Sequence, residues 1–227
     1  MNLDIYLITI GLGVLGAFLY FFLVKDKPYP HTFYLMFFLV TYVFAFENFC
    51  IYLYKSGYPN NNGYYNVFYV YIQSLVIYYF FYNLFEEKPI KRLLFGYVMF
   101  FLIWGGINSI LFQPIGKLPQ TYTYIVGAGG IILCSVYFFY SLLRRNSNLT
   151  DSLMALPQFW IVAALLVFYS SGFIYFLFLG IPNLMEQNTM DIFGGINRTI
   201  ASIMYVVIGF SHFSTVLFST KNGRQLI

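Results

Sequence analysis

Seven apolar runs, each long enough to cross a lipid bilayer, together cover most of the chain of 227 residues. An α-helix needs about 20 apolar residues to span the hydrocarbon core. The breaks between the runs hold charged residues, proline, glycine and asparagine. This pattern predicts an all-α, polytopic membrane protein: a seven-transmembrane-helix bundle that forms a single domain over residues 1–227. The predicted spans are 4–24, 33–54, 64–85, 93–113, 120–143, 157–180 and 193–219.

The composition excludes a soluble fold. Hydrophobic residues make up 60% of the chain and charged residues only 9%, whereas soluble domains carry about 25% charged residues. Seven helices of about 20 residues use most of the length, which leaves no room for a soluble catalytic domain. The net charge of +4 is spread over several short loops. We therefore expect the positively charged loops to contact the anionic headgroups of membrane lipid, and we expect no nucleic-acid partner.

The distribution of lysine and arginine predicts how the helices are oriented. Cytoplasmic loops are enriched in both residues. One set of loops and tails holds nine of the twelve, and the opposite set holds three. This bias predicts an N-terminus outside, a C-terminus inside and a multi-pass protein of the cell inner membrane. The nine are Lys25, Lys27, Lys88, Lys91, Arg92, Arg144, Arg145, Lys221 and Arg224; the three are Lys55, Lys117 and Arg198.

The residues that enzymes require are missing from the predicted spans. Gly11-Leu12-Gly13-Val14-Leu15-Gly16 matches the dinucleotide-binding fingerprint, but that motif functions in a soluble βαβ unit. Intramembrane hydrolysis needs an activated nucleophile, paired aspartates or a metal at bilayer depth, and the chain offers none of these patterns. We predict that it is not an enzyme, with no cofactor and no metal site. Glycine clusters such as the one at 11–16 favour close helix packing instead.

Two formal charges lie well inside predicted spans, Glu47 and Arg198. Intramembrane charges cost about 2.5–3.5 kcal/mol on insertion scales and usually face a partner in the bundle interior. Counted from the predicted span ends, Glu47 is about 10 Å and Arg198 about 8 Å deep on the outer side. We predict that the two face one another, either directly or across a ligand.

Other polar side chains fall in the same predicted outer half and extend this cluster. With Glu47 and Arg198 they form a candidate ligand-binding pocket. A buried ion pair that only fixes helix packing is an equally weighted alternative. The additional candidates are Asn48, Gln73, Asn108 and Asn197.

Spans three, five and six contain several aromatic stretches: 66–68 followed by Gln73 and 78–82, then Thr121 to Gly127, then 157–161 with 166–172. These stretches resemble a family of small uncharacterised seven-helix proteins of Bacteroidetes-type bacteria. Family members often carry a glutamate near the position of Gln73 and are often encoded beside sensor histidine kinases. The resemblance implies a sensory or signalling role and a membrane or cytoplasmic signalling partner such as a histidine kinase.

Three functions remain open at this point. The first is a membrane sensor or signalling-partner protein with a polar pocket in the outer half of the bundle. The second is a small PQ-loop-like solute transporter, suggested by Pro119-Gln120 and Pro157-Gln158 at the starts of two predicted helices. The third is a structural membrane subunit. Transporters usually show internal repeats or helices broken near the midplane, so polar residues gathered on one side favour a sensor.

Overall fold

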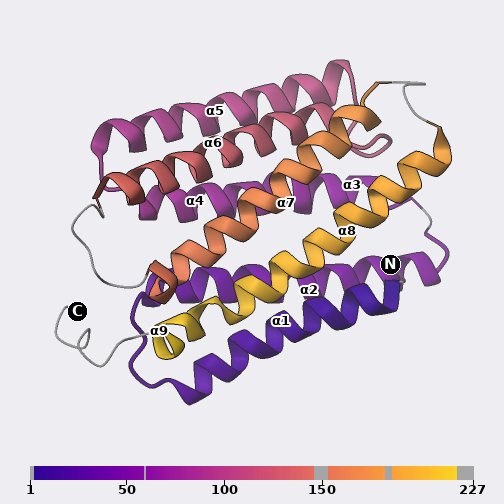
Figure 1. Cartoon of the computed structure of the whole chain (residues 1–227). Helices are drawn as coiled ribbons and strands as arrows, with labels where there is room; N and C mark the ends of the chain where they lie inside the picture. The colour runs from indigo at the N-terminus through magenta and orange to yellow at the C-terminus, as the bar shows by residue number, and fades with distance from the viewer. Residues whose placement is uncertain (1–2, 59, 146–152, 182–185, 219–227) are drawn as a thin grey trace. The chain divides into compact units, whose positions relative to one another are not determined.

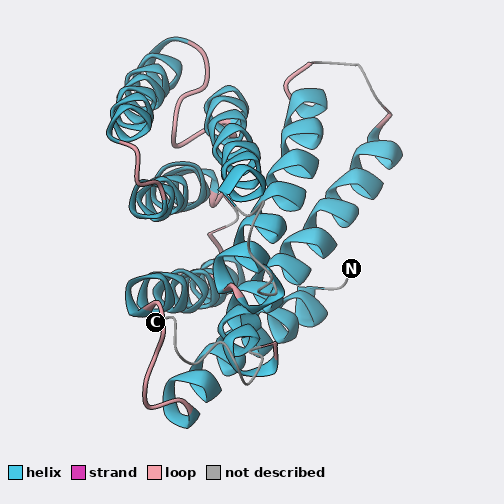
Figure 2. Ribbon diagram, turned by 60° about the vertical axis from the view of Figure 1, so that its left-hand side comes forward, coloured by secondary structure: helices cyan, strands magenta, loops and turns pink. Residues whose placement is uncertain are grey.

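The computed structural model describes residues 3–58, 60–145, 153–181 and 186–218. Within these residues every regular element is a helix, as Figure 2 shows, and seven helical spans are long and apolar enough to cross a membrane. The predicted all-α, seven-helix class is thus confirmed: the chain is a multi-pass integral membrane protein. Lys221 and Arg224, which contribute to the predicted orientation, lie outside the described residues, and the orientation stays a prediction.

The seven spans contain more than seven helical elements because two of them change helix type. In Figure 1 the third span accordingly carries two labels, α3 and α4, and the seventh carries α8 and α9. The third span passes from α-helix into a π-helix and back, and the seventh ends in a 3₁₀ turn and a last short α-helix. The elements are α1 (Leu3–Leu23), α2 (Pro30–Lys55), α3 (Asn62–Tyr65), η1 (Asn66–Gln73), α4 (Ser74–Leu84), α5 (Lys88–Leu111), α6 (Thr121–Arg145), η3 (Leu153–Ala155), α7 (Pro157–Leu179), α8 (Gln187–Phe210), η4 (Ser211–Phe213) and α9 (Ser214–Leu217).

Two helices, α5 and α8, begin five and six residues before their predicted spans at 93 and 193. Helix α5 starts at Lys88, with Pro89 in its first turn, where proline has the backbone angle that a helix needs and lacks only an N–H that would stay unpaired. Lys88, Lys91 and Arg92 therefore belong to the first turns of α5, and assigning them to a loop was wrong. Helix α8 starts at Gln187. Polar residues form its first turn, and they carry no hydropathy signal from which this start could be predicted.

A glycine ends the second span. Gly57 has a φ of 88°, in the left-handed region that glycine enters without steric cost. The amide of Tyr58 then donates a hydrogen bond to the carbonyl of Leu53 at 3.0 Å. This turn pairs a carbonyl that the helix end would leave unsatisfied, and it directs the chain toward the third span.

Large apolar side chains are exposed along the spans. Ile110 is 80% exposed, Phe22 73% and Leu93 71%. In water such side chains would form a surface prone to aggregation, whereas lipid solvates them at no cost. The exposed aliphatic and aromatic surface therefore agrees with the assignment of the helices to a membrane.

The chain folds into two compact units, each built from separate stretches. Unit 1 consists of Met1–Phe44, Ser135–Phe168 and Arg198–Ile227, and unit 2 of Ala45–Cys134 and Tyr169–Asn197. The boundaries fall inside α2, α6, α7 and α8. The single domain over the whole chain stays a prediction.

In unit 1 the glycines of α1 allow direct contact between helix backbones. A Cβ atom added to Gly13 would lie 2.5 Å from the carbonyl oxygen of Tyr205, and one added to Gly209 would meet the carbonyl oxygen of Gly13. Two helices that approach this closely need small residues at the contact. The predicted role of the glycine cluster in close packing is confirmed at Gly13.

We expect Gly13→Ala and Gly209→Ala to destabilise the protein by about 1–3 kcal/mol, the usual cost of overpacking. Gly106→Ala is the matched control, because a Cβ there would meet no atom within 4 Å. Thermal unfolding of the three variants in the same detergent measures the difference. Equal melting temperatures for Gly13→Ala and Gly106→Ala would contradict the close approach of α1 and α8.

Candidate functional site around Glu47

The carboxylate of Glu47 is held by two tyrosine hydroxyls from the third span. Tyr69 donates a hydrogen bond to Oε1 at 2.6 Å, and Tyr65 donates one to Oε2 at 3.1 Å. All three residues belong to unit 2. Glu47 is only 5% exposed and is the one Asp, Glu, Lys or Arg among the buried residues of the described chain. Hydrogen bonds to an ionised acceptor are the strong ones, so the pair of hydroxyls offsets part of the cost of removing this charge from water.

Aromatic rings surround the carboxylate on the side of the third span. The rings of Tyr65 and Tyr69 stack with centroids 5.4 Å apart, and Phe46 stacks on Phe68 at 4.4 Å. Phe46 also meets both tyrosines edge to face. Such ring pairs add about 0.5–1.5 kcal/mol beyond the area they bury. These ring contacts restrain the two tyrosines whose hydroxyls donate to Glu47.

The tyrosine that makes the shorter bond lies in a π-helical segment. Tyr69 is part of η1, an eight-residue π-helix, whereas Tyr65 ends the α-helical turn before it. π-Helical turns are rare and occur frequently at functional sites. Each hydrogen-bonded ring of a π-helix holds one more residue than a ring of an α-helix. The hydrogen bonds to Glu47 thus bind the carboxylate to the least regular part of the span.

Both ends of η1 are fixed by buried amides. Asn66, 3% exposed, donates to the carbonyls of Ile115 and Leu118 at 2.7 and 2.8 Å. At the other end Gln73 donates to the hydroxyl of Tyr169 at 3.3 Å. The predicted candidate Gln73 is therefore buried and hydrogen-bonded to α7, within unit 2.

Asn108 is at the centre of a second cluster of hydrogen-bonded polar side chains, which holds the loop between α5 and α6 in place. Its side-chain amide is fully buried and donates to Gln120 at 2.8 Å and to Thr123 at 2.9 Å. The backbone amide of Gln120 in turn donates to Asn66 Oδ1 at 3.0 Å, which joins this loop to the start of η1. Further members of the group are Gln113, Thr121, Tyr71 and Ser109.

The remaining candidates lie on other helices. Asn197 accepts a hydrogen bond from the hydroxyl of Ser171 at 3.1 Å, and Asn48 is exposed on α2, next to Glu47. Arg198 is exposed on α8 and lies eleven residues after the first residue of that helix, Gln187, or about 16 Å along its axis. The predicted depth of Arg198, about 8 Å below the outer end of its apolar run, stays a prediction. Glu47 and Arg198 belong to different units, and their meeting stays a prediction.

Sequence reasoning missed the two tyrosines that bind Glu47. Neither Tyr65 nor Tyr69 was among the candidate residues predicted from the sequence. Tyr65 and Tyr69 are four residues apart and thus share one face of a helix, next in the chain to the span that carries a buried acid. This spacing was the available signal, but the 23 tyrosines of the chain gave many similar pairs.

The fold places the chain in the class of multi-pass integral membrane proteins with seven spanning helices. Comparisons of the chain with protein-family models, with curated proteins and with solved structures find no match. The candidate site is therefore defined by its geometry: a buried carboxylate, two hydroxyl donors and a π-helical segment that carries one of them.

Removing a hydroxyl from the Glu47 site should destabilise the protein. We expect a loss of about 1.5–3 kcal/mol for Tyr69→Phe, which removes a hydrogen bond to a charged group, and a smaller loss for Tyr65→Phe because its bond is longer. The control is Tyr140→Phe, since Tyr140 is 58% exposed. Thermal unfolding in detergent gives the order, and a Tyr69→Phe protein as stable as Tyr140→Phe would count against the hydrogen bond.

Proposed function

We propose that the chain is a membrane sensor in which Glu47 responds to a ligand and η1 transmits the response. The observation that carries this proposal is a buried carboxylate whose hydrogen-bond donors lie on and beside a π-helical segment. An ionisable residue inside a membrane span is a functional-site hypothesis by default, because a protein that needs only packing avoids its cost.

The carboxylate has acceptor capacity left for a ligand. An ionised carboxylate offers about four lone-pair positions, and the hydroxyls of Tyr65 and Tyr69 use two of them. The neighbouring aromatic faces favour a cation, since a ring attracts positive charge to its face. The chemistry of the site therefore suits a small organic cation such as an amine, or a guanidinium group. Arg198, the partner predicted from the sequence, carries the same kind of group.

The π-helical segment supplies an element with two states. When a π-helical turn converts to α-helix, the residues beyond it shift by one position, or about 100° around the axis. A cation that binds Glu47 would compete with the hydrogen bond from Tyr69. The weakening of that hydrogen bond would favour the conversion of the π-helical turn to α-helix. Because Asn66 connects the start of η1 to the loop before α6, the change would reach two neighbouring helices as well as α4.

The resemblance to a family encoded beside sensor histidine kinases supports a signalling partner of that kind at the membrane. The basic loops support an inner-membrane location with the C-terminus in the cytoplasm. In this proposal the ligand acts from the outer side, and the partner responds on the inner side.

Ligand-dependent stabilisation tests the sensor directly. The purified full chain is titrated with choline, ethanolamine and guanidinium chlorides. We expect at least one of them to raise the melting temperature of the parent, since a ligand at 100 times its Kd stabilises by about 2.7 kcal/mol. The Glu47→Gln variant should lose this response. Glu86→Gln, which removes an exposed acid outside the site, should keep it.

Two outcomes would overturn the proposal. The first is that no compound separates the parent from Glu47→Gln. The second is that the stabilising compound accumulates inside proteoliposomes that contain the protein, which would make the chain a transporter of that compound. A sensor binds its ligand without moving it across the bilayer.

A further inference from the structure

A groove between α4 and α5, distinct from the Glu47 site, has a volume of about 610 Å³. It lies entirely in unit 2. The α4 side presents Leu75, Tyr78, Tyr79 and Tyr82, which recur at the spacing of one helix face. The α5 side presents Lys88, Lys91, Arg92, Leu94, Phe95 and Val98.

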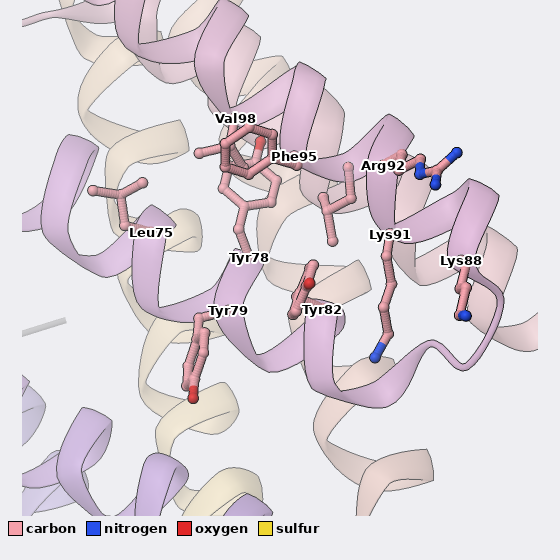
Figure 3. Close-up of a pocket in the computed structure, with 10 residues that line it drawn as sticks. Leu75, Tyr78, Tyr79, Tyr82, Lys88, Lys91, Arg92, Phe95 and Val98 are labelled. Carbon is pink, nitrogen blue, oxygen red and sulfur yellow. The ribbon is translucent and has the colours of Figure 1, made fainter.

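The groove is polar at one end and apolar along the rest (Figure 3). Lys88, Lys91 and Arg92 gather at the end where α5 begins, while Leu75 and Val98 lie toward the other end. No acidic residue is among the ten lining residues. The two acids before α5, Glu86 and Glu87, are not among the residues that line the groove. The basic end therefore presents three positive charges to whatever occupies the groove.

Two contacts define the walls near the basic end. The ammonium group of Lys91 lies 4.9 Å from the centroid of the Tyr82 ring, a cation–π distance that holds the lysine at the mouth of the groove. Tyr78, 2% exposed, donates to the carbonyl of Gly127 at 2.7 Å and is thereby fixed against α6. The groove thus has a rigid inner wall, whereas Tyr79 and Phe95 at its edges are 58% and 63% exposed.

The length and position of the groove match one leaflet of a bilayer. From Lys88 to Val98 the α5 side advances by ten residue steps, or about 15 Å, which is half of the roughly 30 Å hydrocarbon core. The basic end lies at the start of the candidate span Lys88–Leu111, and the headgroup layer adjoins the two ends of a spanning helix. A molecule in this groove would have its anionic group at the surface and an apolar chain alongside the helices.

We propose that this groove binds one anionic phospholipid. The phosphate contacts Lys88, Lys91 and Arg92, and an acyl chain packs against Leu75, Phe95 and Val98. The occupant is a lipid rather than free phosphate, because the apolar part of the groove would otherwise be unused. This site is a defined place for a single lipid molecule, beyond the general attraction of basic loops to anionic membranes.

Native mass spectrometry of the full chain, titrated with phosphatidylglycerol or phosphatidylcholine of the same chain length, tests the site. The parent should retain phosphatidylglycerol preferentially. The K88Q/K91Q/R92Q variant should lose this preference, by about fivefold for each charge removed. A control variant, K25Q/K55Q/K117Q, changes the net charge equally but leaves the groove intact and should keep the preference.

A second pair of variants tests the apolar part without changing charge. Leu75→Trp and Val98→Trp fill the groove and should each lower phosphatidylglycerol retention severalfold, with helicity by circular dichroism as the check of folding. Glycerol phosphate, which carries the anionic group without a chain, should not compete at concentrations where the lipid binds.

Three results would overturn the site: equal retention of the two lipids by the parent, the same loss in K25Q/K55Q/K117Q as in the groove variant, or effective competition by glycerol phosphate. The last of these would make the basic end a site for soluble phosphate.

Discussion

A carboxylate surrounded by lipid-solvated helices must find its hydrogen bonds inside the protein, and this constraint organises the candidate site. Glu47 meets it with the hydroxyls of Tyr65 and Tyr69. Without those donors the ionised group would bear the full cost of a buried, unsatisfied charge. The position of the third span relative to the end of α2 therefore depends on two hydrogen bonds, and one of them comes from a π-helix.

The same constraint explains why polar side chains gather at both ends of η1. Asn66 and Asn108 connect the third span to the loop before α6 through Gln120, and Gln73 connects it to α7. Each of these amides forms hydrogen bonds with polar groups that lipid cannot hydrogen-bond. The π-helical segment is thus held at its start, along its length and at its end. A segment fixed in three places can stay in a less common helix type.

Much of the fold was predictable because lipid imposes a single rule on every span. The seven helices follow from seven apolar runs, since a spanning segment must satisfy its own backbone. The early starts of α5 and α8 were not predicted, because Pro89 and the polar residues after Gln187 form good first turns yet carry no hydropathy signal. The close approach of α1 was predicted from its glycines, and Gly13 confirms it. The partner helix was not predicted, because it depends on tertiary packing.

The candidate site was predictable only in part. The cost of burying a charge identified Glu47, and the structure finds it buried. Its tyrosine donors depend on which way the side chains of the third span face. The four-residue spacing of Tyr65 and Tyr69 did not distinguish this pair from the many similar pairs among the 23 tyrosines of the chain. Asn108 was predicted as a lining residue of a pocket, and its actual partners, Gln120 and Thr123, become neighbours only through the fold of the loop between them.

The most direct test of the account is amide hydrogen–deuterium exchange of the full chain in lipid nanodiscs, compared between the parent and Glu47→Gln. If the carboxylate holds η1 in place, Glu47→Gln should speed exchange over residues 62–73 and leave the middle of α5 unchanged. Identical exchange over residues 62–73 in both proteins would contradict the central claim that Glu47 stabilises the π-helical segment.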